Sequence, residues 1–204
     1  YPIIMAGNGV IRGNANDELV RFAEKLNIPI ATTFMAKGAI PFSHELSLGT
    51  VGLQAHDYVA CGFDRADVII CVGFDMVEYH PQSWHQNKDK KIIHIDQIYA
   101  EVDEHYILEV GVIGDIAASL EQIGEVTTAT TNAYSHELRE VIVEELTAMA
   151  EDNSFPMKPQ RILCDIREAL EKEDILISDV GAHKMWIARM YQAEAPNTCI
   201  ISNG

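Results

Sequence analysis

Residues 179–183, Asp-Val-Gly-Ala-His, have the types and spacing in this sequence that best suit an anion-binding site. They follow a short apolar segment that predicts a parallel strand, and they precede a predicted helix over 184–191. In open α/β sheets, ligands bind at the carboxyl ends of the strands. Gly181 lets a ligand come close, the next backbone N–H groups can meet an anion, and His183 can donate a hydrogen bond. These features indicate a diphosphate site, and the alternative is a plain turn in which Asp179 caps the helix.

A second glycine-bearing turn, over residues 7–13, lies between a predicted strand and a predicted helix. Glycines at such a turn let the backbone approach a phosphate group. However, the spacing of Gly7, Gly9 and Gly13 is not that of the dinucleotide-binding motif, and no acidic residue clearly ends the second strand to hold a ribose. The sequence therefore favours a tight turn without a ligand at residues 7–13. The alternative is that residues 1–123 serve as a nucleotide- or flavin-binding module, or as a purely structural one.

The other reactive side chains show no catalytic or metal-ligating pattern. The eight histidines lack the H-E-x-x-H spacing, so His80, His85 and His94 are interpreted as surface-loop or core residues. Glu78 precedes an aromatic pair and is assigned to a packed loop after a strand rather than to a binding site. No G-x-S-x-G turn occurs, and the four cysteines contain no C-x-x-C pair, so reduced thiols are expected. We therefore assign no catalytic residue and no metal ligand within this sequence.

The composition excludes several classes of partner. The 204 residues include 31 acidic and 15 basic side chains, which gives a formal net charge of −16. Nucleic-acid binding needs clustered lysine and arginine, and this excess of negative charge repels a polyanion. No apolar run approaches the ~20 residues that span a bilayer, and no secretory signal opens the chain. We expect a cytoplasmic protein that binds a small molecule, with neither nucleic acid nor membrane as a partner.

The elements that position these residues alternate between short apolar strands and helices. Strands are predicted at 2–6, 28–32, 67–73, 91–96 and 110–114. In the strand predicted over 67–73, residues 68–72 are continuously apolar, which is typical of a parallel strand buried on both faces. Asn14 or Asn16 is expected to cap the first helix and Asp115 to cap a helix over 115–123, while 36–52 is expected to be a loop. The alternation predicts the α/β fold class, with a Rossmann-like parallel sheet and flanking helices.

The sequence changes character at residues 124–133, which are rich in threonine and show no core pattern. An acidic amphipathic helix is predicted over 135–150, followed by a helix over 160–172 with Pro159 in its first turn. Two short strands then begin a second α/β unit. We therefore predict three parts: a central Rossmann-like domain over 1–123, a linker with the acidic helix over 124–158, and the beginning of a second domain over 159–204.

The combined order of these motifs resembles the acetolactate synthase group of thiamine-diphosphate enzymes. Residues 179–186, Asp-Val-Gly-Ala-His-Lys-Met-Trp, and the final Ile-Ser-Asn-Gly over 201–204 are similar to the start of the domain that holds the diphosphate in that group. Residues 1–123 are similar to its middle domain, through the successive segments 2–10, 29–33, 49–52, 66–73 and 92–96. The resemblance covers nearly the whole chain, and the order of the segments is more specific than any single motif.

Within this family, residues 72–79 together with Pro81 and Trp84 look most like the catabolic branch, which does without flavin. The biosynthetic, flavin-containing branch has an arginine and paired acids after the corresponding strand. These are absent here, which counts against FAD, although residues 52–54 stand where the flavin branch has ligand contacts.

The resemblance implies a transferase that uses thiamine diphosphate and Mg²⁺ to join two pyruvate molecules into 2-acetolactate with loss of carbon dioxide. By the same resemblance, Gly181, Ala182 and His183 match positions that meet the diphosphate. Gly204, with Asn203, matches the backbone near the aminopyrimidine ring. A homodimer or homotetramer acting on a small 2-keto acid is implied as well. Another decarboxylase or carboligase of the same family is the alternative.

The two ends of the sequence suggest a fragment. It begins at Tyr1 rather than at a methionine, and it stops at Gly204 directly after an apolar strand. In the family that it resembles, the glutamate that activates the aminopyrimidine would precede Tyr1. The Gly-Asp-Gly and Asn motif that holds the magnesium would follow Gly204. We therefore expect no carboligation by this chain alone, and measurable carboligation would contradict that expectation.

Overall fold

The computed structural model describes residues 1–52, 58–129 and 134–202. Within these residues, six parallel strands form one sheet in the order β3-β2-β1-β4-β5-β6. The strands are β1 (Pro2–Ala6), β2 (Ile30–Thr32), β3 (Ser47–Thr50), β4 (Val68–Val72), β5 (Lys91–Asp96) and β6 (Leu108–Ile113). Strands β2 and β3 are added on one side of β1, and strands β4 to β6 are added on its other side. This strand order is that of a doubly wound sheet. The prediction of a Rossmann-like α/β fold is confirmed.

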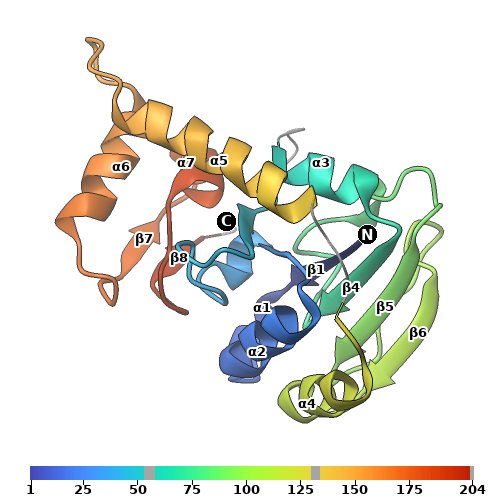
Figure 1. Ribbon diagram of the computed structural model, residues 1–204. Coiled ribbons are helices and arrows are strands. Elements are labelled where there is room, and N and C mark those ends of the chain that lie inside the picture. The colour runs from blue at the N-terminus through green and yellow to red at the C-terminus, as the bar shows by residue number, and fades with distance from the viewer. Residues whose placement is uncertain (53–57, 130–133, 203–204) are drawn as a thin grey trace.

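Helices cover both faces of this sheet (Figure 1). One face carries α1 (Asn8–Arg12), α2 (Asn16–Leu26) and α4 (Ile116–Val126), and the other carries α3 (Tyr58–Arg65) and α5 (Tyr134–Ala150). The central strands are buried on both sides, which explains the continuous apolar run of β4. Burial of two separate apolar layers supplies the main favourable free energy of this domain.

The differences from the sequence prediction lie at the element ends. The segment predicted as a loop over 36–52 contains β3, whose short sequence has a single large apolar side chain, Leu48. The strand forms because it pairs with β2. Neither Asn14 nor Asn16 caps a helix, since α2 has Ala15 at its N-cap and α1 already begins at Asn8. The Asp115 cap is confirmed by its carboxylate, which accepts a hydrogen bond from the N–H of Ala118 at 2.9 Å.

The remaining elements form a smaller unit beside the sheet. They are α6 (Pro159–Ala169), β7 (Leu176–Ser178), α7 (Ala182–Met190) and β8 (Cys199–Ile201), with β7 and β8 paired in parallel. Helix α5 runs along both units, from α3 to α6 (Figure 1). Its predicted apolar face is confirmed, because Leu138, Ile142 and Leu146 are buried in the same core as α3. None of the described helices is long and apolar enough to cross a membrane.

Candidate functional site

The turn from β7 to α7 contains a glycine with an unusual backbone conformation. Gly181 has a φ of +154°, a backbone conformation that L side chains rarely adopt. A Cβ atom at Gly181 would also lie 2.7 Å from Cε1 of the His183 ring, which folds back over this glycine. The backbone conformation at position 181 therefore favours glycine.

The first N–H groups of α7 are available to an anion. Asp179 does not cap the helix: its carboxylate accepts from the N–H of Val180 at 2.7 Å, and Gly181 is the N-cap without a side-chain hydrogen bond. The N–H groups of Ala182 and His183 have no intrahelical acceptor and no other acceptor among the described residues. All three residues from Gly181 to His183 are exposed, so a ligand can reach these donors.

Strand β8 ends beside this turn. Ile201 is paired with Ser178, and the N–H of Ser202 donates to the carbonyl of Ser178 at 3.0 Å. The carboxyl ends of both strands therefore lie at the same edge. Asn203 and Gly204, the other two candidate cofactor-binding residues, lie outside the described residues.

A buried lysine connects α7 to the central sheet. Lys37 Nζ donates to Thr50 Oγ1 at 3.0 Å and to the carbonyl of Ala188 at 2.9 Å. The residue is only 5% exposed, and this burial lowers the pKa of Lys37 to about 8, against an opposing effect of Cys199. The contact joins the end of β3 to the C-terminal half of α7, so it fixes the helix that carries the candidate site.

Ion pairs and hydrogen bonds on the surface reinforce the same junction. Arg189 of α7 lies 3.0 Å from the carboxylate of Glu145 on α5. Glu194, in the segment after α7, accepts hydrogen bonds from the N–H and the hydroxyl of Ser43 at 3.1 and 2.6 Å. The unit that carries α7 is therefore tied both to α5 and to the loop that precedes β3.

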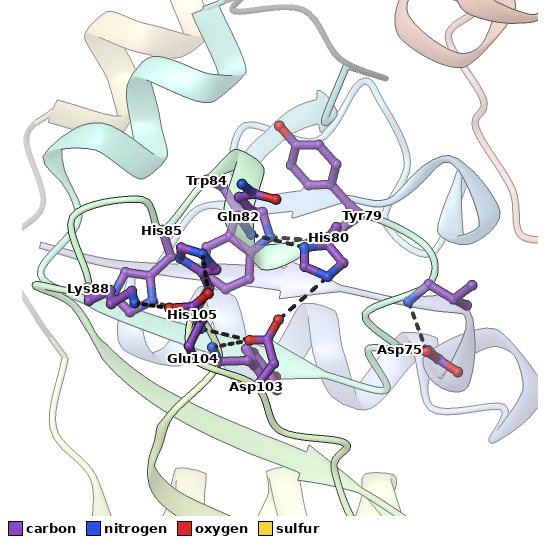
Figure 2. A network of polar contacts seen from close by, with 12 residues as sticks. Asp75, Tyr79, His80, Gln82, Trp84, His85, Lys88, Asp103, Glu104 and His105 are labelled. Carbon is purple, nitrogen blue, oxygen red and sulfur yellow. Dashed lines mark hydrogen bonds and ion pairs between the residues drawn. The ribbon is translucent and has the colours of Figure 1, made fainter.

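The histidines of the loops after β4 and β5 have structural roles (Figure 2). His85 Nε2 accepts from the N–H of Lys90 at 3.1 Å, so Nδ1 is the donor to the carbonyl of His105 at 2.7 Å. His80 Nε2 lies 3.5 Å from the carboxylate of Asp103. Among the described residues, no group of three or more His, Cys, Asp or Glu side chains could hold a metal ion. The contacts of His80 and His85 join the loop that follows β4 to the loop that follows β5.

His94 is a core residue, which agrees with its interpretation from the sequence. It is 2% exposed, and its Nδ1 lies 2.8 Å from the hydroxyl of Tyr106.

No disulfide links the four cysteines, all of which lie in the described residues.

Three buried polar side chains, Thr33, Lys37 and Glu78, are not predicted as site residues from the sequence. Lys37 is the single charge in the otherwise uncharged stretch over 34–42, and this isolated charge was the available signal. Thr33 and Glu78 meet across the sheet edge although they are 45 residues apart in the sequence. No local sequence pattern predicts the contact between Thr33 and Glu78, because it depends on the tertiary fold.

Comparisons with known proteins agree with this architecture. The family model described as "Thiamine pyrophosphate enzyme, central domain" matches residues 1–123. A "Probable acetolactate synthase large subunit" of Methanococcus aeolicus is 31% identical over the whole chain, which covers 37% of that relative. The protein with the same description in Methanocaldococcus jannaschii is 30% identical and 36% covered, and an "Acetolactate synthase" of Bacillus subtilis is 28% identical and 37% covered. The chain thus spans little more than a third of the length of these relatives.

Proposed function

Because this chain belongs to the thiamine pyrophosphate enzymes, whose central domain it contains, we propose that the protein is a thiamine-diphosphate-dependent acetolactate synthase. The reaction joins two pyruvate molecules into 2-acetolactate and releases carbon dioxide. The single observation that carries the proposal is the exposed turn at the carboxyl end of β7, with its glycine and its unused N–H groups.

The residues of this turn fit the diphosphate group. The N–H groups of Ala182 and His183 would donate to its oxygens, and the absence of a side chain at Gly181 lets them come close. The imidazole of His183 adds a further donor. Asn203 and Gly204 are proposed to meet the aminopyrimidine ring. When bound, thiamine diphosphate supplies the carbanion chemistry that acts on the keto carbon of the substrate.

The rest of the described chain holds this turn in place. Lys37 and Arg189 fix the C-terminal half of α7 against the sheet and against α5, so the N-terminal turn keeps its direction. A rigidly supported site loses less conformational entropy when it binds its ligand. The central domain therefore acts as the scaffold of the cofactor site.

The wider proposal extends to the protein as a whole. It includes Mg²⁺ as the partner of the diphosphate, a homodimer or homotetramer, and a cytoplasmic location. No described residue is assigned to the magnesium ion. The same cofactor chemistry serves other 2-keto acids, so the activity assay uses a panel of 2-keto acids beside pyruvate, with a protein of the full length of the relatives.

Binding of the cofactor tests the proposed site directly. Thiamine diphosphate and thiamine are titrated into the chain in the presence of Mg²⁺, and heat or tryptophan fluorescence is measured. We expect thiamine diphosphate to bind more tightly than thiamine, and His183→Ala to weaken binding severalfold. His136→Ala, which removes an exposed histidine of α5, is the matched control and should bind like the unaltered chain. Equal binding of both ligands, or no effect of His183→Ala, would contradict the proposal.

A further inference from the structure

The point where the strand order reverses, between β1 and β4, is the place where a doubly wound sheet binds a nucleotide. The two strands lie side by side in the middle of the sheet (Figure 1), and their carboxyl ends lead into the turn at Gly7 and the turn at Gly73. A flavin or NAD phosphate, if this domain bound one, would be expected here. Whether the crevice can bind a phosphate therefore depends on which of its hydrogen-bond donors are unused.

The backbone N–H groups of the first turn are already used within the chain. Gly7 donates to the carbonyl of Val72 at 2.9 Å, and Gly9 donates to the carbonyl of Gly73 at 2.8 Å. The N–H of Val10 donates to the carbonyl of Gly7 at 3.1 Å. Only the N–H of Asn8 remains, and it donates to a side chain rather than to the backbone.

The glycines of this crevice allow the backbone of the turn after β1 to pack directly against the backbone of the turn after β4. A Cβ atom at Gly9 would lie 2.6 Å from Cα of Gly73, and a Cβ atom at Gly73 would lie 2.4 Å from the nitrogen of Val10. Real Cβ atoms essentially never come this close to another atom. The space that glycine leaves for a phosphate in nucleotide-binding turns is here filled by the turn after β4.

The side chain that binds the N–H of Asn8 is Glu78. Both of its carboxylate oxygens lie 3.1 Å from this nitrogen, and one accepts from the hydroxyl of Thr33 at 2.5 Å. The N–H of Asp75 is a further donor at 3.4 Å. Glu78 is 4% exposed, so the carboxylate is held at the ends of β1, β2 and β4 and away from water. The N–H and hydroxyl groups around Glu78 donate to its carboxylate in the way that they would donate to a bound anion.

We propose that Glu78 is a built-in anion of the central domain. Its carboxylate takes the place where a doubly wound sheet binds a nucleotide phosphate, so this crevice accepts neither flavin nor NAD. A small carboxylate or phosphate binds there only after the side chain of Glu78 has been removed. Glu78 is thus a residue that determines ligand specificity, and this role does not depend on the proposed diphosphate site at α7.

The test combines titration of the unaltered chain with rescue of a truncated side chain. FAD and ADP are first titrated into the chain, and no binding at the crevice is expected. Binding that shifts the amide signals of Asn8 or Asp75 would overturn the proposal. This part needs no variant, so it remains decisive even if a variant fails to fold.

The rescue experiment uses Glu78→Ala with acetate and with inorganic phosphate as separate probes. The variant leaves the donors of Asn8, Thr33 and Asp75 without their acceptor, and an acetate ion can replace the lost carboxylate. At about ten times the dissociation constant, mass action predicts a rise in Tm of about 3–6 °C for a chain of this size. Glu78→Gln keeps the space filled and should show no saturable rise.

Glu101→Ala is the matched control, because it removes an exposed glutamate from a loop. A response to acetate that is equal in Glu78→Ala and Glu101→Ala would overturn the proposal. Failure of thiamine diphosphate to bind at α7 would leave this outcome unchanged, so the two proposals are tested separately.

Discussion

Replacement of Lys37 by methionine should abolish a rise of stability with pH. Lys37 is buried between the sheet and α7, and its ammonium group donates to Thr50 and to the carbonyl of Ala188. Burial disfavours the charged form and is the largest cause of the lowered pKa of Lys37. Methionine keeps the length and the apolar stem of the side chain but cannot carry the charge.

The magnitude follows from the two pKa values. The ordinary pKa of lysine is 10.5 and the pKa of Lys37 in the fold is about 8, a difference that costs about 3 kcal/mol while the group is charged. Below the folded pKa both states bind the proton, so the full cost is present. Above about 8 the folded state releases the proton while the unfolded state keeps it, and stability rises with pH up to about 10.5. Linkage predicts a gain of about 1 kcal/mol between about pH 7 and about pH 9.

The assay is urea unfolding followed by tryptophan fluorescence at both pH values. Cys199 titrates beside Lys37, and burial raises the pKa of its thiol, so all proteins carry Cys199→Ala. Lys91→Met, at an exposed lysine, is the matched control and should keep the gain. Lys37→Met should lose it. If Lys37→Met shows the same rise with pH as its parent, the assignment of a buried, destabilised ammonium group is wrong.

Three further changes test other parts of the structure. Asp115→Ala removes the cap on the N–H of Ala118 and should cost about 1 kcal/mol, measured by thermal unfolding with circular dichroism. Gly181→Ala should weaken thiamine-diphosphate binding in calorimetry and cost about 1–3 kcal/mol in urea unfolding, because position 181 has a positive φ that alanine rarely adopts. Leu19→Ala, at a side chain that is 0% exposed, should cost about 2–5 kcal/mol in urea unfolding, and a smaller loss would contradict its place in the core.

The sequence predicted the elements whose signal is local. The bounds predicted for the strand over 91–96 are those of β5, and β4 was recognised from its continuous apolar run. Strand β3 was missed because Ser-Leu-Gly-Thr has no strand pattern of its own and depends on pairing with β2. The last turn of α4, which extends to Val126, lies beyond the predicted end at 123 because the pattern there is weak.

The candidate site divides in the same way. The turn at Gly181 could be predicted because strand, glycine and helix follow one another along the chain. The contact between Glu78 and Asn8 joins residues 70 apart, and that between Lys37 and Ala188 joins residues 151 apart. Such contacts depend on the tertiary fold, and only the presence of a charge in a buried stretch hints at them.

Backbone amide chemical shifts, followed during titration with thiamine diphosphate and Mg²⁺, test the proposed diphosphate site at the start of α7. We expect saturable shifts at Gly181, Ala182 and His183 that thiamine without its diphosphate does not produce. Shifts confined to the crevice around Asn8 and Glu78, or no saturable shift at the turn after β7, would contradict the proposed site.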